Sequence, residues 1–281
     1  MPDVLYEKNL EEHYAVFTFN RPERLNALGG NLVKDLNDAL MDFNNDVEMR
    51  VGIVTGSGRA FSAGADLKEM SDRNTVSSEI QAKFDSGAID SQERTRQLAE
   101  AGILRAGGLR NTFPFSSSPK PMIAAVNGLA IGGGCEQAMD CDIRIASTEA
   151  FFGLFEVKRG ILAGYGIHHA ARVMPFGEAM YLLLTADRLS AEQAQKIGFV
   201  HEVVEPEALL PRAVEIAKMI AGNAPVAVQG TKAMTQFWRQ FAMEESQRLG
   251  SWVSRAVQSS DDAKEGPRAF AEKREPNWKG R

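Results

Sequence analysis

Strand-like and helix-like segments alternate along the chain as far as about residue 205, and helical patterns dominate from there to the C-terminus. The first strand-like segment, HYAVFTFNRP, alternates and is rich in β-branched and aromatic residues. Apolar residues from Leu32 to Phe43 follow at helical spacing. Ser190 and Gln193 have the spacing of a helix capping box. This order predicts an α/β architecture that ends in a helical region.

The composition is that of an ordinary globular protein, with 44% hydrophobic and 25% charged residues among 281. The net charge of −5 and the lack of a dense basic stretch argue against nucleic acid as a partner. No segment has the roughly 20 apolar residues of a membrane helix, and the acidic start is no secretory signal. Cys135 and Cys141 are expected to be small buried hydrophobes. We therefore expect a cytoplasmic protein without a membrane partner or a bound metal.

Two strand-to-helix turns consist of small residues, SAGADLK at 62–68 and IGGGCEQA at 131–138. The sequence predicts a single strand, within 121–134, before the second turn. Such turns leave backbone N–H groups free at a helix start, where the helix dipole also favours negative charge. Two such donors, one from each turn, could together bind an oxyanion. For either turn alone, close packing of helix against strand is the favoured explanation of the glycines.

Other functions fit the glycine-rich segments less well. GSGRAF at 56–61 lacks the third glycine of a dinucleotide-binding turn, because Phe61 stands in its place. AFSAG at 60–64 is one glycine short of a hydrolase nucleophile elbow, and no histidine after it lies in a recognisable catalytic context. A serine hydrolase is therefore a minor alternative.

Six segments follow one another along the chain: RPERLNAL (21–28), GSGRAFSAGADLKEM (56–70), KPMIAAVNGLAIGGGCEQAMDCDIRIAS (120–147), FFGLFEVKRGI (151–161), ADRLSAEQAQKIGFVHEVV (186–204) and EGPRAFAEKREPNWKGR (265–281). Their order and spacing resemble the enoyl-CoA hydratase/isomerase, or crotonase, family. The resemblance covers most of the chain except residues 71–115, where we expect a helix near 92–105, and parts of the helical tail. It implies a spiral of repeated ββα units in residues 1–205 and a helical region, residues 206–281, that mediates trimerisation, often as a dimer of trimers.

The resemblance also implies how a coenzyme A thioester would bind as substrate, so no separate cofactor is expected. The backbone N–H groups of Ala65 and Gly133 match those that form the oxyanion hole for the thioester carbonyl. The other positions that match coenzyme A contacts are Arg24, Ala27, Ala63, Asp66, Leu67, Lys68, Phe270 and Lys273. In relatives, the positions of Phe270 and Lys273 also reach the coenzyme, partly from a neighbouring subunit.

Glu136 and Glu156 match the two catalytic glutamates of the hydratases. The chemistry needs two carboxyl groups on one water, one to orient or deprotonate it and one to deliver a proton to Cα. Taken alone, Glu136 is better explained as a solvated acid in a first helical turn, and Glu156 as a surface acid paired with Lys158 or Arg159. Within the resemblance, Glu136 is expected to activate water and Glu156 to exchange the proton at Cα.

These features predict an enoyl-CoA hydratase that adds water reversibly and syn across the 2,3 double bond, through an enolate held in the oxyanion hole. An isomerase or another crotonase reaction is the alternative, because many isomerases of the family keep only one glutamate. A binding protein with the same fold is a further alternative, since some relatives bind RNA. Phe155, where relatives commonly have proline, and Tyr165 depart from the family pattern and are expected to reshape the acyl end of the pocket.

Overall fold

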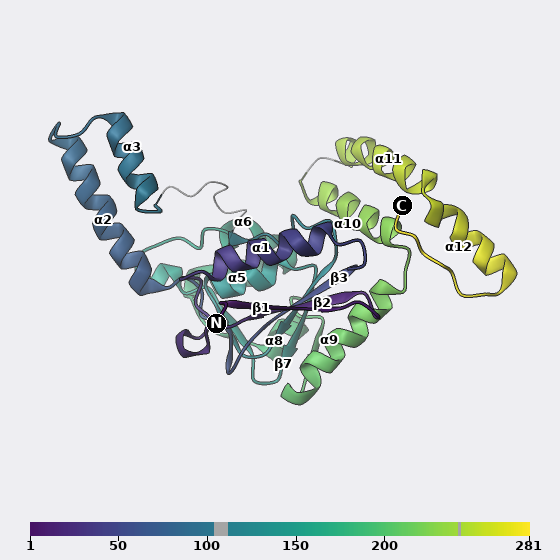
Figure 1. Cartoon of the computed structure of the whole chain (residues 1–281). Coiled ribbons are helices and arrows are strands. Elements are labelled where there is room, and N and C mark those ends of the chain that lie inside the picture. Colours follow the sequence, from purple (N-terminus) through teal and green to yellow (C-terminus); the bar gives the residue numbers. More distant parts are fainter. Residues whose placement is uncertain (104–111, 241–242) are drawn as a thin grey trace.

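The computed structural model describes residues 1–103, 112–240 and 243–281, in which two sheets lie among helices (Figure 1). The six-stranded sheet has the order β1-β2-β3-β5-β7-β10, and its neighbours are parallel except β1 and β2. The four-stranded sheet has the order β4-β6-β8-β9. The strands are β1 (Val4–Asn9), β2 (Tyr14–Phe19), β3 (Val51–Gly56), β4 (Ala60–Ser62), β5 (Met122–Val126), β6 (Leu129–Ile131), β7 (Ile143–Ser147), β8 (Phe151–Gly153), β9 (Leu189–Ser190) and β10 (Glu202–Val204).

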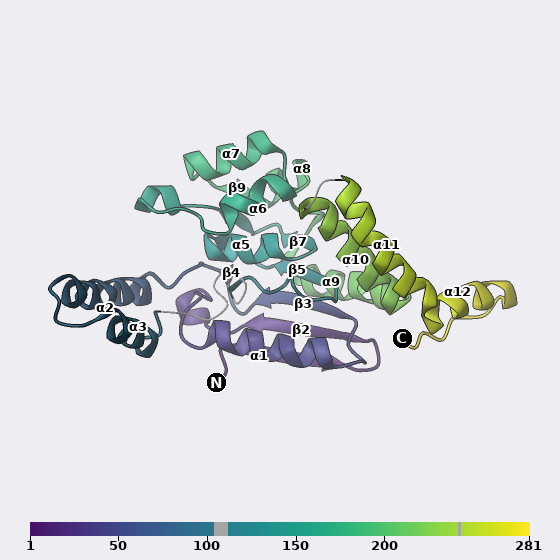
Figure 2. The ribbon, with the colours of Figure 1, turned by 90° about the horizontal axis from the view of Figure 1, so that it is seen from above.

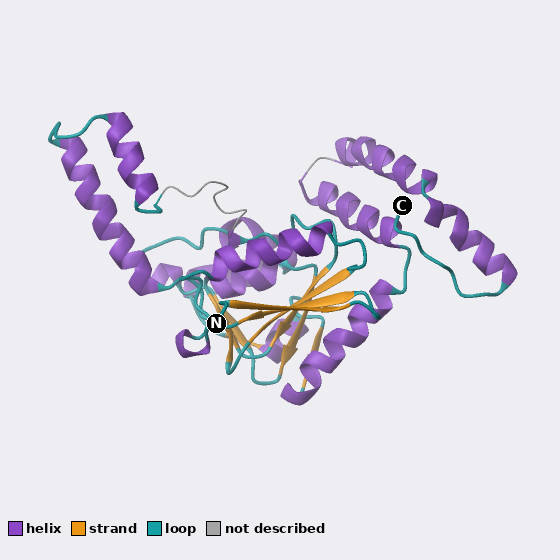
Figure 3. Ribbon diagram, viewed as in Figure 1, coloured by secondary structure: helices purple, strands orange, loops and turns teal. Residues whose placement is uncertain are grey.

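The helices of the described residues occupy both faces of the large sheet and project from two sides of it (Figures 1 and 3). They are η1 (Pro22–Arg24), α1 (Leu32–Asn45), α2 (Leu67–Asp85), α3 (Ser91–Glu100), α5 (Gly133–Asp140), η2 (Glu156–Arg159), α6 (Gly166–Val173), α7 (Phe176–Thr185), α8 (Ala191–Lys196), α9 (Pro206–Ala221), α10 (Pro225–Gln240), α11 (Met243–Ser259) and α12 (Asp261–Glu272).

From β3 to β8, consecutive strands alternate between the two sheets. The chain leaves β3, β5 and β7 of the large sheet and enters β4, β6 and β8 of the small one, and helical segments follow each pair. A repeated strand–strand–helix path of this kind is the spiral that the sequence predicts. The predicted α/β class with ββα repeats and a C-terminal helical region is therefore confirmed.

Asn127 turns the chain from β5 of the large sheet into β6 of the small one. Its side-chain oxygen accepts a hydrogen bond from Gly56 N at 3.1 Å. A Cβ on the following Gly128 would lie 2.2 Å from Arg59 O, so the close approach of two backbones requires glycine here. The prediction of a single strand within 121–134 is therefore wrong, because this turn divides the segment into two strands.

The core consists of two layers separated by the large sheet. On one face, α9 packs Leu209, Ala213 and Ile216 against Ile53 and Ile123 of β3 and β5. On the other face lie α1, α5 and the small sheet. Central strands with both faces covered are expected to be apolar throughout, as β5 is.

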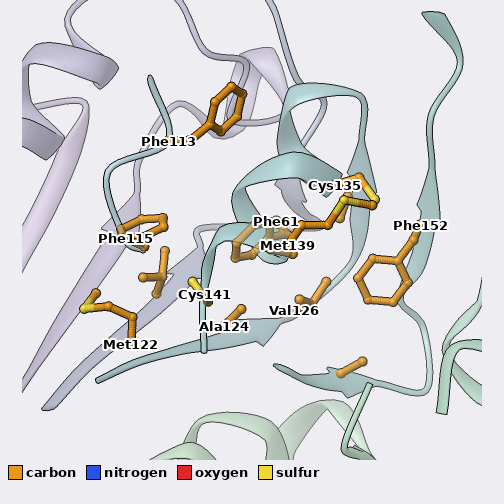
Figure 4. Packing of buried hydrophobic residues seen from close by; sticks show 14 of the residues in the cluster. Phe61, Phe113, Phe115, Met122, Ala124, Val126, Cys135, Met139, Cys141 and Phe152 are labelled. Atoms are coloured by element: carbon orange, nitrogen blue, oxygen red, sulfur yellow. The ribbon is translucent and has the colours of Figure 1, made fainter. Parts of the chain in front are cut away.

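The second layer holds α5 in place at its first turn (Figure 4). Cys135 and Met139 of α5 lie over Ala124 and Val126 of β5, and all four side chains are buried. The predicted burial of Cys135 and Cys141 is confirmed. Because the first turn of α5 packs in this way, the acid that follows Cys135 in the sequence is carried into the interior.

Two helical projections extend from opposite sides of the core (Figures 1 and 2). One is the α2–α3 pair, and the other consists of α10, α11 and α12. The helix predicted near 92–105 is α3, Ser91–Glu100, and residues 104 and 105 lie outside the described residues. None of the described helices has the combination of length and apolar character that crossing a membrane demands.

Candidate active site

A cavity of about 520 Å³ lies where the two glycine-containing turns meet the segments that follow β8. One wall is formed by the β4–α2 turn and α2, including Ala63, Ala65 and Met70. Phe155 and Leu162, from the segments that follow β8, also line the cavity. Sequence segments from Leu28 to Gly164, far apart in the chain, therefore contribute to one site.

The two turns touch each other at this cavity. Gly64 has a φ of +81°, and a Cβ there would lie 2.8 Å from Gly133 N. A Cβ on Gly133 would in turn lie 3.6 Å from Ala65 N. Within the described part of the chain, neither the Ala65 amide nor the Gly133 amide donates a hydrogen bond. Two backbone donors are thus close together and available to a ligand, one of them at the start of α5.

Glu136 lies in the first turn of α5, and it is 5% exposed. Its Oε1 accepts hydrogen bonds from Tyr165 N at 2.9 Å and from Gly166 N at 2.6 Å. Gly166 is the first residue of α6, so the carboxylate binds the amides at a helix start. The alternative that Glu136 is a solvated acid in a first helical turn is wrong, because its side chain is buried and held by two hydrogen bonds.

Glu156 is the first residue of η2, and it is half-buried at the same cavity. Its Oε2 is buried and has no hydrogen-bond partner among the described residues. A Cβ on Gly132 would lie 2.9 Å from Glu156 Oε1, so glycine there leaves room for the carboxylate. Lys158 and Arg159 donate instead to Ala186 O and Phe155 O, which contradicts the surface ion pair considered for Glu156.

Both carboxyl groups have a raised pKa. Burial raises the pKa of Glu136, the charge of Glu156 adds to the rise, and the amides of Gly166 and Tyr165 oppose it. Burial also raises the pKa of Glu156, against the effect of its own backbone amide and of Arg159. Raised carboxyl pKa values in a cavity are typical of groups that take up and release protons.

Several residues predicted to contact coenzyme A do lie around the cavity, namely Ala63, Ala65, Asp66 and Leu67. Asp66 also caps α2, where its Oδ1 accepts from Lys68 N and Glu69 N. The Lys68 side chain is exposed and does not line the cavity.

Arg24 and Ala27 lie next to this region without lining the cavity. Arg24 ends η1 and is exposed, and Ala27 is buried. Leu28, which follows Ala27, bridges to Ala65 and lines the cavity. The segment therefore borders the first turn through its backbone.

The structure does not bring Phe270 and Lys273 to the cavity of the same chain. Phe270 is 88% exposed on α12, and Lys273 caps the end of that helix with a φ of +53°. The α12 helix lies on the side of the molecule away from α2 (Figures 1 and 2).

Two features of the site were missed by sequence reasoning. Asp140, which is one helical turn after Glu136, is buried and binds the hydroxyl of Tyr165. Phe113 stacks on Tyr165 and lines the cavity. Asp140 lies at i+4 from Glu136, and an acid on the same face of a buried helix could have drawn attention to it. In the described parts of the chain, no three His, Cys, Asp or Glu side chains group as metal ligands.

Comparison with known proteins gives full-length similarity. A family model described as enoyl-CoA hydratase/isomerase matches residues 10–87 and 78–281. The short-chain-enoyl-CoA hydratase of Clostridium acetobutylicum is 39% identical over 97% of this chain and 95% of that protein. The (E)-benzylidenesuccinyl-CoA hydratase of Thauera aromatica is 37% identical over the full length of both.

Solved structures of similar proteins agree with the fold. A crystal structure of an enoyl-CoA hydratase from Mycobacterium tuberculosis H37Rv has a TM-score of 0.84 and 33% identity, and the match covers all of both chains. An enoyl-CoA hydratase from Bacillus anthracis has a TM-score of 0.83 and 31% identity, again over both whole chains. The similarity therefore includes the projecting helices as well as the core.

Proposed function

The chain belongs to the enoyl-CoA hydratase/isomerase family of enzymes, and on that premise we propose that it adds water reversibly across the 2,3 double bond of a 2-enoyl-CoA thioester. Relatives that match it over almost their whole length include the Clostridium short-chain hydratase and a crotonyl-CoA hydratase of Syntrophomonas wolfei, which is 36% identical. Their names support hydration as the reaction.

One observation carries the proposal: Glu136 and Glu156 reach the same cavity as the amides of Ala65 and Gly133. A hydratase needs both kinds of group, because water must lose one proton, Cα must gain another, and negative charge must develop on the thioester oxygen in between. An isomerase needs only one proton-transferring acid beside the same oxyanion site. The second carboxylate at the cavity therefore favours hydration.

The thioester carbonyl would accept hydrogen bonds from Ala65 N and Gly133 N. These donors are already fixed by the contact between the two turns, so they need no rearrangement as charge develops. When the oxygen of water forms its bond to C3, the electrons of the C2–C3 double bond move onto the thioester oxygen as an enolate. The two amides would stabilise that charge.

The two glutamates would divide the proton transfers. Glu136 is held through Oε1 by two amides, which leaves Oε2 to accept a proton from water. Glu156, whose Oε2 has no partner among the described residues, would deliver a proton to C2 as the enolate collapses. The raised pKa of Glu156 suits a group that must be protonated before this step.

The cavity walls set the class of acyl group. Phe113, Phe155, Ile161 and Leu162 line it, so an apolar acyl group would contact mainly apolar and aromatic side chains. The named substrates of the relatives range from crotonyl-CoA to an aromatic benzylidenesuccinyl-CoA. We propose a short or aromatic 2-enoyl-CoA as substrate.

A panel of thioesters tests this function. Purified protein would be incubated with crotonyl-CoA, a longer straight-chain 2-enoyl-CoA and an aromatic 2-enoyl-CoA, and loss of the conjugated thioester absorbance would be followed. Hydration of at least one member is expected. If none is hydrated, while a 3-enoyl-CoA is converted to its 2-enoyl isomer, the protein is an isomerase.

We also propose that the protein assembles as a homotrimer or a dimer of trimers in the cytoplasm. The division into residues 1–205 and 206–281 is part of this proposal. Trp252 and Phe270, on α11 and α12, are 69% and 88% exposed in the single chain, and closed symmetric assembly is the usual way to cover such groups. Light scattering should give three or six times the mass of the chain. A monomer at micromolar concentration would contradict the proposal.

A further inference from the structure

Tyr165 lies between two acids of α5, and the reaction outlined above makes no use of its side chain. Its main-chain N donates to Glu136 Oε1 at 2.9 Å, and its phenol hydroxyl donates a hydrogen bond to Asp140 Oδ1. Glu136 and Asp140 are four residues apart, about one helical turn. One residue therefore binds both carboxylates of one helix, with its main chain and its side chain.

Asp140 is a strong anchor for that hydroxyl. It is 3% exposed, and its Oδ2 accepts from Phe115 N at 2.6 Å. Burial raises the pKa of Asp140, and hydrogen bonds from Ser116 and Tyr165 oppose the rise. A buried acceptor that loses its partner is destabilising, and more so when it is charged. The Tyr165 hydroxyl is therefore held in place, because moving it away would remove a hydrogen bond from the buried Asp140 carboxylate.

The ring of Tyr165 is fixed on both faces. It stacks on Phe113 with centroids 4.6 Å apart and on His169 with centroids 3.7 Å apart. Phe113 lines the cavity, and His169 lies on α6. The ring and the hydroxyl together connect α5, the start of α6 and the wall of the cavity.

We propose that Tyr165 is a positioning residue for Glu136. Its hydrogen bond to Asp140 fixes the loop before α6, so that the amides of Tyr165 and Gly166 stay directed at Glu136 Oε1. The inference rests on the proposed function, because it assigns Tyr165 to the orientation of the carboxylate that activates water. A displacement of about 1 Å at a reacting group can cost up to 10²-fold in rate.

Tyr165→Phe tests this with little change in shape, since the ring and both stacking contacts remain. Turnover of the best enoyl-CoA should fall about 10-fold, while KM stays within about 2-fold of the original value, because the substrate contacts are unchanged. Tyr6→Phe is the matched control. Tyr6 also stacks on a buried ring, that of Phe17, and it lies in β1 outside the cavity, so turnover should not change.

A double-mutant cycle separates positioning from a merely structural role. If Tyr165 acts through Glu136, Tyr165→Phe should lose most of its effect on kcat when it is made in Glu136→Gln protein. Its effect on the melting temperature should persist in both backgrounds. The same 10-fold loss in both backgrounds, or no loss in either, would overturn the inference.

If the unmodified protein hydrates no thioester in the panel, the proposed function fails before the cycle is reached. If Tyr165→Phe does not fold, Asp140→Asn removes the charge of the acceptor, and its effect on kcat should likewise disappear in Glu136→Gln protein. An Asp140→Asn effect that is equal in both backgrounds would also overturn the inference.

Discussion

Glu136 and Glu156 reach one cavity from regions that are built differently. Glu136 lies on a buried helix, and two amides from the start of α6 bind one of its oxygens. Glu156 begins a short 3-10 helix, and its Oε2 has no partner among the described residues. The first carboxylate is oriented by the protein, whereas the second is left to be oriented by water or substrate. Similar residues at one cavity can therefore have different tasks.

Their electrostatic surroundings agree with this difference. Burial raises the pKa of both groups, but at Glu136 two amides stabilise the charged form. At Glu156 the opposing influences are its own amide and the nearby charge of Arg159. The comparison predicts a fixed base at Glu136 and a proton carrier at Glu156.

Replacing each glutamate by glutamine should have the largest effect. A general acid or base contributes about 10²–10⁴ in rate, so Glu136→Gln and Glu156→Gln should each lower the hydration rate by about that factor. Because both act on one water, the double variant should lose far less than the product of the two single losses. The measurement is kcat for each variant, with Glu178→Gln on the exposed face of α7 as control.

If the protein is an isomerase, the two glutamine variants should differ strongly in activity. Glu156→Gln would then abolish activity, and Glu136→Gln would leave most of it. Full hydratase activity in Glu136→Gln protein would contradict the two-carboxylate mechanism and the role of Glu136.

A side chain at Gly133 should cause the next largest loss of rate. Both proton transfers should slow equally, because both depend on the bound thioester carbonyl. A Cβ there would lie 2.8 Å from Leu28 Cδ1 and beside the Ala65 amide, so Gly133→Val should hinder the approach of the carbonyl. Loss of one oxyanion donor typically costs about 10²–10³ in rate. Gly177→Val, on the open surface of α7, is the control. Near-full turnover of a folded Gly133→Val protein would show that the carbonyl binds elsewhere.

Gly132→Ala should disturb Glu156 and leave Glu136 in place. Its Cβ would lie 2.9 Å from Glu156 Oε1, at a φ of +53°, so the carboxylate must move. We expect turnover to fall about 10-fold, as a displaced catalytic group predicts. Gly198→Ala carries the strain of a positive φ with no neighbour within 4 Å, and should leave turnover unchanged. An equal loss in Glu156→Gln protein would show that the effect does not pass through Glu156.

The sequence predicted the fold and the identities of the acids better than it predicted how they are held. The alternation of strands and helices and the capping box of Ser190 and Gln193 are confirmed, because both depend on residues close together in the chain. The strand β1 (Val4–Asn9), which precedes the first predicted strand, was missed. The turn at Asn127 was missed because its partners come from the end of β3. The pattern of neighbouring residues in a sequence does not reveal a contact between residues as far apart in the chain as Gly56 and Asn127.

The same limit applies to the site. Small residues in two turns could be recognised from sequence, whereas the contact between Gly64 and Gly133 depends on how the two sheets pack. That Tyr165 binds both Glu136 and Asp140 could not be predicted, since it requires α6 to lie against α5. Tyr165 was noticed only as a departure from the family pattern, and it was expected to reshape the pocket. Its ring in fact lies behind Phe113, which lines the cavity, and its hydroxyl points to Asp140.

The smallest expected effect concerns stability, and it tests the raised pKa values directly. A carboxyl whose pKa is higher in the folded than in the unfolded state contributes stability that is complete below its unfolded pKa and is lost as pH rises through its folded pKa. Glutamine cannot ionise and avoids that loss. Glu136→Gln and Glu156→Gln should therefore gain stability relative to the original protein as pH rises from about 4 toward neutrality, by about 1.4 kcal/mol for each unit of raised pKa. Because the charge of Glu156 contributes to the raised pKa of Glu136, the double variant should gain less than the sum of the single gains. Urea unfolding of the four proteins between pH 4 and 8 measures these differences, and a stability difference that does not vary with pH would show that the carboxyls titrate alike in the folded and unfolded states.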